Sequence, residues 1–200
     1  MAELIADPRE FVSLQMQGRS VFDLEKRLPS QVFQRKCRYY ACEYPLIFDK
    51  AFSLFLSSIA SQFKDQTVHY MTLDPSPDYY CKHYGHFGLA SFDPKILQTR
   101  YMDVMTRNDP GSFRSHVNIG AFWGSSLSWG IMCDRISWEL CIIGIAGGSK
   151  LSICSNFPLM KLNDVNRYVA AAYHWKPAVA SDFSREFSEN YLSDRQERTP

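Results

Sequence analysis

Residues 121–148 hold the longest apolar run of the chain. Trp129 and Ile131 would project to the same side of a strand, because successive side chains of a strand point to opposite faces. Nearly every position from 140 to 145 is apolar, which is typical of a strand that is buried on both faces. Because the link between the two segments is short, the pattern predicts a central antiparallel hairpin.

Helical and strand-like apolar patterns also occur outside the central hairpin. Apolar residues recur at spacings of three and four in segments that we predict to be helices, namely 48–63, 94–107, 163–173 and 181–192. Asp93-Pro94 supplies a capping acid and a first-turn proline to the second of these. Strand-like alternation or β-branched content favours strands over 66–73, 113–122 and 151–154.

The N-terminal part of the chain is less regular. Residues 1–19 show no clear period, so we interpret them as an irregular arm, and the apolar spacing after Ser20 predicts a short helix that ends before Pro29. Residues 30–44 mix basic and aromatic side chains. Three basic residues are few for a nucleic-acid surface, so we interpret this segment as a solvated helix face.

These elements predict one α+β domain over residues 1–192, with a central, largely antiparallel sheet flanked by helices. We expect about four to six strands, the usual size of a sheet. The last residues, 193–200, are expected to form a frayed tail.

Composition narrows the function classes. A content of 46% hydrophobic and 14% aromatic residues is ample for a core, which argues against a disordered chain. A net charge of +1 gives no reason to expect nucleic acid or an anionic membrane as partner. No apolar run approaches the roughly 18 residues of a spanning helix, and the N-terminus lacks the apolar core of a signal peptide. We therefore expect a cytoplasmic protein, whose six cysteines are reduced thiols.

Three residues are candidate metal ligands: Cys81, His83 and His86. Zinc takes thiolate and imidazole ligands, and His69 or His116 would be available to complete such a site. The spacing matches no standard zinc motif, and scattered ligands of this kind are more often structural, so we assign neither a metal nor another cofactor.

No sequence motif selects a catalytic residue. A cysteine–histidine nucleophilic pair stays open, because any cysteine can lie near a histidine in space. The serines of GSSLSWG (124–130) do not form a nucleophile elbow, and residues 144–150 lack the Gly-Lys-Ser/Thr order of a phosphate loop.

Asp134, Arg135 and Glu139 are the charged residues of the predicted hairpin. The simpler interpretation is that they are solvated at the turn and edge, where charges deter edge-to-edge pairing. The alternative is a charged surface that meets a partner.

The same hairpin resembles part of a known protein family. Ser128-Trp129-Gly130-Ile131, Asp134-Arg135 and Trp138-Glu139-Leu140 resemble a segment of small cytosolic bacterial proteins that are encoded beside polymorphic or contact-dependent toxins. Several of these proteins are immunity proteins. Val68-His69-Tyr70, Asp74-Pro75 and Tyr79-Tyr80 add to the similarity, which covers residues 46–147 at most. The resemblance implies a non-enzymatic protein that binds and blocks a toxin domain, and it implies no catalytic residues.

We therefore expect a protein-binding module, most concretely an immunity or antitoxin-like protein. Its expected partner-binding residues are Asp134, Arg135, Glu139, Tyr79 and Tyr80. Further aromatic anchors, if exposed, would be Tyr39, Tyr40 and Trp175, and also Trp123, for which we favour a place in the core.

The alternative function is a small cytosolic enzyme, a hydrolase or a metal-dependent enzyme, that uses Cys81, His83 or His86. A deep polar pocket whose titratable groups have shifted pKa values would favour the enzyme. A flat surface rich in aromatic side chains would favour the binding module.

Overall fold

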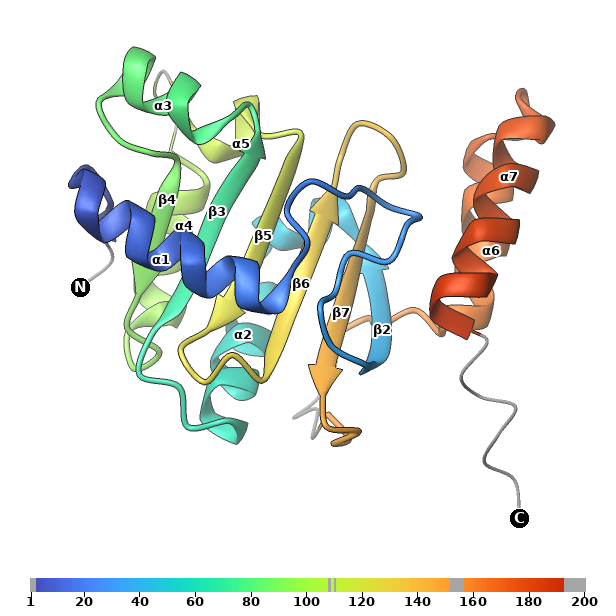
Figure 1. Cartoon of the computed structure of the whole chain (residues 1–200), viewed down its shortest axis with the longest axis horizontal. Helices are drawn as coiled ribbons and strands as arrows, with labels where there is room; N and C mark the ends of the chain where they lie inside the picture. The colour runs from blue at the N-terminus through green and yellow to red at the C-terminus, as the bar shows by residue number, and fades with distance from the viewer. Residues whose placement is uncertain (1–2, 108, 110, 152–156, 193–200) are drawn as a thin grey trace.

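The computed structural model describes residues 3–107, 109, 111–151 and 157–192. One sheet, antiparallel at every pairing, runs through the domain in the order β1-β4-β3-β5-β6-β7-β2, and helices pack on both of its faces (Figure 1). The predicted α+β domain is confirmed, with seven strands where four to six were expected.

The strands are β1 (Glu3–Leu4), β2 (Cys37–Glu43), β3 (Val68–Asp74), β4 (Leu89–Phe92), β5 (Ile119–Gly124), β6 (Trp129–Asp134) and β7 (Leu140–Ala146). The helices are α1 (Pro8–Val21), the 3₁₀ helix η1 (Tyr44–Phe48), α2 (Lys50–Gln62), α3 (Pro77–Tyr84), α4 (Leu97–Met105), α5 (Phe113–His116), α6 (Leu162–Ala172), α7 (Pro177–Phe187) and the π-helical η2 (Ser188–Leu192). No helix in these ranges is both long and apolar enough to cross a bilayer.

The central hairpin is confirmed. β6 pairs with β7 from Trp129 opposite Ile145 to Asp134 opposite Leu140, and every residue of β6 is buried. The core preference for Trp123, on neighbouring β5, is also confirmed, because its side chain is fully buried.

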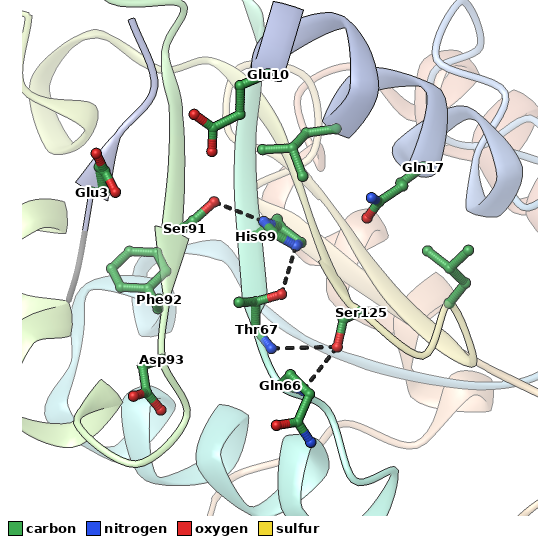
Figure 2. A pocket seen from close by; sticks show the side chains of 12 residues that line it. Glu3, Glu10, Gln17, Gln66, Thr67, His69, Ser91, Phe92, Asp93 and Ser125 are labelled. Carbon is green, nitrogen blue, oxygen red and sulfur yellow. Dashed lines mark hydrogen bonds between the residues drawn. The ribbon is translucent and has the colours of Figure 1, made fainter. Parts of the chain in front are cut away.

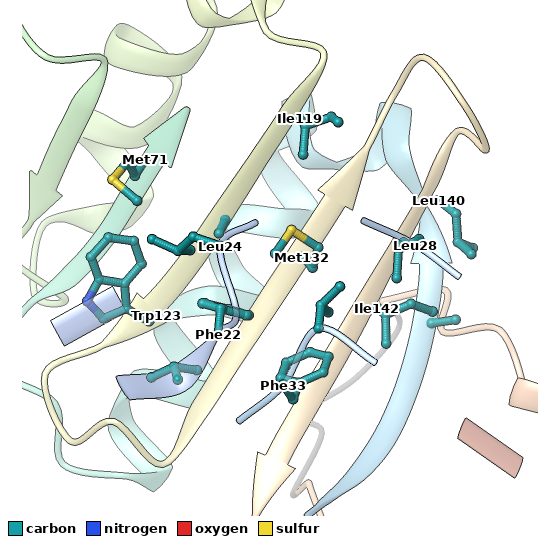
Figure 3. Packing of buried hydrophobic residues seen from close by; sticks show 14 of the residues in the cluster. Phe22, Leu24, Leu28, Phe33, Met71, Ile119, Trp123, Met132, Leu140 and Ile142 are labelled. Atoms are coloured by element: carbon teal, nitrogen blue, oxygen red, sulfur yellow. The ribbon is translucent and has the colours of Figure 1, made fainter. Parts of the chain in front are cut away.

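One face of the sheet is covered by α1, by the irregular chain that follows it, and by α6 and α7 (Figure 1). Phe22 and Phe33, which belong to this irregular chain, lie over the strands among Met132 and Ile142 (Figure 3). A Cβ atom at Gly144 would come within 2.5 Å of the Phe33 ring. The strand glycine therefore makes room for an aromatic ring that closes this face.

The opposite face is covered by η1, α2, α4 and α5. The apolar stripe of α2 faces the sheet as its spacing predicts, and Phe52 lies 5.4 Å from Phe122 of β5 between ring centroids. α2 and α4 are shorter than the helices predicted over 48–63 and 94–107. α6 begins and ends one residue before the predicted 163–173, and the last helix begins at Pro177, earlier than predicted.

The N-terminal predictions were wrong. Residues 8–21 form α1, which begins at Asp7, whose carboxylate accepts hydrogen bonds from the amides of Arg9 and Glu10. Only a narrow stripe of α1 is buried, so its period is weak. The helix expected after Ser20 is instead mostly irregular chain.

Three further segments differ from the prediction. Residues 37–43, expected on a solvated helix, form the edge strand β2. Residues 77–84 form the helix α3 and residues 89–92 the strand β4, neither of which was predicted. Residues 113–116 are the short helix α5, so the strand predicted over 113–122 begins only at Ile119. Leu151 is not in a strand, and the rest of the strand predicted over 151–154 lies outside the described residues, as does the tail 193–200.

Candidate functional site

A cavity of about 690 Å³ opens on the α1 face of the sheet, between α1, β4, β3 and the turn from β5 to β6 (Figure 2). Its walls are formed by Glu3, Glu10, Leu14, Gln17, Gln66, Thr67, His69, Ser91, Phe92, Asp93, Ser125 and Leu127. These residues come from segments that are far apart in the sequence, so no local motif marks them.

His69 lies at the centre of this cavity wall and is only 4% exposed. The alternation of β3 turns its side chain toward the α1 face, away from Tyr70, and its ring lies 5.4 Å from that of Trp123. Its Nδ1 is 2.8 Å from Ser91 Oγ, and its Nε2 is 3.0 Å from Thr67 Oγ1. Both ring nitrogens therefore have a hydroxyl partner.

The protonation state of His69 follows from its burial. Burial lowers the pKa of the imidazole from 6.5 to about 4, an effect that the nearby Asp65 carboxylate only partly offsets. His69 is therefore neutral at pH 7, with one nitrogen donating and the other accepting.

The contact between Ser91 and His69 has the geometry of a nucleophile and its base. Two features weaken such a role. A base with a pKa of about 4 is a poor proton acceptor at neutral pH. The second ring nitrogen meets a hydroxyl, and no carboxylate hydrogen-bonds the ring within the described residues. The arrangement positions hydroxyl groups in the cavity wall rather than activating one of them.

Asp65 fixes the turn at the lower side of the cavity. It is 8% exposed, and its carboxylate accepts hydrogen bonds from the Trp129 indole at 2.7 Å and from the Ser126 amide at 2.6 Å. Ser125 Oγ in turn accepts a hydrogen bond from the Gln66 amide at 2.8 Å, which holds the turn against the start of β3 (Figure 2).

The three candidate metal ligands do not converge. Cys81 and His83 are on α3, where Cys81 packs against the core of the α1 face and the His83 ring lies 4.3 Å from Tyr79. His86 follows the helix, and its Nδ1 accepts a hydrogen bond from the Gly88 amide at 3.1 Å. The described residues contain no group of three or more side chains placed to hold a metal ion.

The predicted partner-binding residues divide into two groups. Arg135 and Glu139 are exposed at the hairpin, and Tyr79 is 41% exposed on α3. Asp134 and Tyr80 are buried. The prediction that Asp134 is a solvated charge was therefore wrong, and in this structure neither Asp134 nor Tyr80 presents its side chain to a partner.

Asp134 is held beneath the hairpin turn. Its Oδ1 accepts a hydrogen bond from the Ser137 amide at 2.8 Å, whereas its buried Oδ2 has no hydrogen-bond partner within the described residues. Burial is the main reason why the pKa of this carboxyl is raised above its usual value.

An aromatic surface lies where the β6–β7 hairpin meets the turn between α6 and α7. We define this aromatic surface as Ile136, Trp138, Tyr173, Trp175 and Val179. Ile136 and Trp175 are 64% and 61% exposed. The ring of Tyr173 lies between the two tryptophans, 5.4 Å from Trp138 and 6.1 Å from Trp175. Of these residues, sequence reasoning anticipated only Trp175 as a possible anchor.

Comparison with protein families, curated proteins and solved structures finds no match to this chain.

Proposed function

We propose that this protein is a non-enzymatic binding module of the immunity or antitoxin type, which binds a toxin domain and neutralises it. The observation that carries the proposal is the aromatic surface, on which Trp175 is largely exposed beside Tyr173 and Ile136 is largely exposed next to Ser137, the hydrogen-bond partner of Tyr173. Contiguous exposed apolar side chains mark interaction sites, and tryptophan and tyrosine are enriched among the residues that contribute most to binding.

The aromatic surface is held in place from below. The Tyr173 hydroxyl donates a hydrogen bond to the Ser137 carbonyl, which ties the end of α6 to the hairpin. The Trp138 indole donates to the Leu28 carbonyl at 2.9 Å, and its ring lies 4.4 Å from that of Phe183 on α7. A surface that is already ordered loses little conformational entropy on binding, which favours high affinity.

Charged side chains surround the aromatic surface. The Lys176 ammonium lies 4.4 Å from the centroid of a Trp175 ring, and Arg135 and Glu139 are exposed on the hairpin. Charges at the rim of an interface accelerate association and select the partner, while the central aromatic residues contribute more of the affinity.

The His69 cavity fits part of the alternative function, because it is polar and holds a titratable group of shifted pKa. Its histidine is neutral and bonded at both nitrogens, and the residues named for the enzyme, Cys81, His83 and His86, lie elsewhere. These observations favour the binding module over the enzyme.

The test begins with the tagged protein in its native lysate, from which a stoichiometric partner is isolated and identified by mass spectrometry. The partner domain is then expressed alone and together with the protein. The proposal expects growth inhibition by the partner domain alone and relief of that inhibition by the protein. A partner domain that does not inhibit growth contradicts it.

Variants then locate the interface. Trp175→Ala and Ile136→Asp are each expected to weaken binding of the isolated partner by about 10- to 100-fold, the usual range for a residue at the centre of an interface. Met16→Asp is the matched control, because Met16 is also strongly exposed but lies on α1. Equal affinities of all three variants, measured by calorimetry with unchanged melting temperatures, would place the interface elsewhere.

A further inference from the structure

The cavity beside His69 carries negative charge that the described protein does not neutralise. Glu3 comes from β1, Glu10 from α1, and Asp93 directly follows β4 (Figure 2). No lysine or arginine lines the cavity among the described residues. None of the three carboxylates forms an ion pair within residues 3–107, 109, 111–151 and 157–192.

His69 does not supply the missing positive charge. It is neutral at pH 7, because burial lowers its pKa to about 4, and its nitrogens are already bonded to Ser91 and Thr67. Among the described residues, the wall of the cavity therefore carries a net negative charge.

The remaining walls restrict the kind of occupant. Leu14, Phe92 and Leu127 provide apolar surface, and Gln17 and Gln66 provide amide groups. A volume of about 690 Å³ lies within the range of cavities that hold organic ligands. No three carboxylate, thiol or imidazole groups in the described chain are close enough for a bare metal ion, so the charge and the apolar walls together favour an organic cation.

We propose that this cavity binds an organic cation, an ammonium or guanidinium group on an alkyl stem. The charged group pairs with a carboxylate of the wall, which is supplied by Glu3, Glu10 or Asp93, and the stem packs against Leu14, Phe92 and Leu127. Both cations form charge-assisted hydrogen bonds with carboxylates, and these are stronger than neutral hydrogen bonds. Contact of the stem with the apolar walls removes apolar surface from water. This proposal is independent of the toxin-binding proposal, because it concerns different residues and a different assay.

The first experiment is titration calorimetry of the whole chain with agmatine, which carries both cationic groups on a four-carbon stem, and with hexanoate as an anion with an apolar stem. We expect agmatine to bind at physiological ionic strength and hexanoate not to bind. Absence of agmatine binding, or equal binding of the two probes, would overturn the proposal.

Variants of the carboxylates test whether binding occurs in the cavity. Glu10→Gln is expected to weaken agmatine binding by about 5-fold, and the double variant with Asp93→Asn by more than about 20-fold, from the loss of charge-assisted hydrogen bonds. The asparagine introduced by Asp93→Asn keeps an oxygen that can accept the Lys95 amide, so the local turn is preserved. Asp103→Asn is the control, because Asp103 is an exposed carboxylate that pairs with Arg100 on α4. Equal losses in the double variant and the control would show diffuse attraction and overturn the proposal.

A second probe separates two sources of the same chemistry. A blocked pentapeptide with a central arginine presents the guanidinium group as a protein side chain would. If it binds more tightly than agmatine, the cavity receives a side chain of a polypeptide. If agmatine binds and the peptide does not, the ligand is a free small molecule. Either conclusion also requires that the bound probe lose affinity in Glu10→Gln and in the double variant with Asp93→Asn.

Discussion

A buried aspartate lies at each end of β6, and the two carboxylates are in opposite situations. At the Trp129 end, Asp65 accepts hydrogen bonds from the Trp129 indole and from the Ser126 amide. At the other end, one oxygen of Asp134 is bonded to the Ser137 amide and the other has no partner within the described residues. One carboxylate is satisfied and the other is not.

The two regions therefore differ in how completely their buried polar groups are hydrogen-bonded. Polar contacts organise the cavity end, since Asp65 holds the turn that carries Ser125 and hydroxyl groups hold His69. The hairpin end has hydrogen bonds of its own, from the Trp138 indole to the Leu28 carbonyl and from the Tyr173 hydroxyl to the Ser137 carbonyl, but none of the described residues bonds the second oxygen of Asp134. A buried acceptor without a partner costs free energy, so packing at the hairpin end must outweigh that cost.

The largest effect is expected from Asp65→Asn. The variant replaces one acceptor oxygen with an N–H₂ group, which leaves either the Trp129 indole or the Ser126 amide without its acceptor in a buried site. We expect a loss of about 3 kcal/mol in the free energy of unfolding, the usual result of breaking a buried charge-assisted hydrogen bond. Urea denaturation at pH 7 measures it. A loss no larger than that of the exposed control Asp103→Asn would contradict the role of Asp65.

The next effect depends on pH and concerns His69. Its pKa is about 4 in the folded protein and 6.5 when unfolded, so the unfolded chain binds more protons between these values. The stability that neutral His69 contributes is complete above about pH 6.5 and decreases as the pH falls toward 4. From pH 7 to pH 5 the native protein is expected to lose about 2 kcal/mol more than His69→Gln, which cannot titrate. Parallel pH profiles of the two proteins would contradict the burial of a neutral imidazole.

Asp134→Asn is expected to have the smallest effect at neutral pH, within about 1 kcal/mol of the native stability. Asparagine keeps the oxygen that accepts the Ser137 amide and removes the buried charge, although its N–H₂ group takes the position that has no partner within the described residues. Urea denaturation of this variant beside Asp65→Asn tests the comparison directly. Equal losses would mean that the two carboxylates are equivalent.

The pH dependence of the stability that Asp134 contributes has the opposite sign to that of His69. The raised pKa of Asp134 means that its contribution to stability is greatest below the unfolded value of 3.8 and is lost as the pH rises through the folded value. The native protein should therefore gain stability relative to Asp134→Asn as the pH falls from 7 to 4.5, as measured by the same denaturation curves. A constant difference between the two proteins would show that Asp134 does not titrate in this range.

Strong local patterns account for the parts of the fold that the sequence predicted. β6 and β7 are short, mostly apolar segments that are buried on both faces, and α2 carries a helical apolar stripe. Both patterns are readable without knowledge of their neighbours. α1 was missed because it rests on the sheet with a narrow stripe of residues, although Asp7-Pro8 gives the same start signal as Asp93-Pro94. β2 was missed because an edge strand with exposed charges has the composition of a solvated helix.

The functional regions were harder to predict than the fold. The environment of His69 is supplied by α1, β4 and the β5–β6 turn, and that of Asp134 by the irregular chain, α6 and the hairpin. Apart from Thr67 and Ser137, these surroundings come from segments that are distant in the sequence. A charge beside a turn is usually solvated, so Asp134 gave no local sign of its burial.

The position of β2 in the sheet has a consequence for folding during synthesis. β2 pairs along its whole length with β7, from Cys37 opposite Ala146 to Glu43 opposite Leu140, and its outer edge is bridged at Ala41 by Met160. A nascent chain emerges from its N-terminus, so β2 has left the ribosome long before either partner exists. Unpaired strands with apolar faces are the species that chaperones bind and that aggregate. The second strand to be synthesised is thus among the last to be paired, and the yield of folded protein should depend on protection of residues 37–43 during translation.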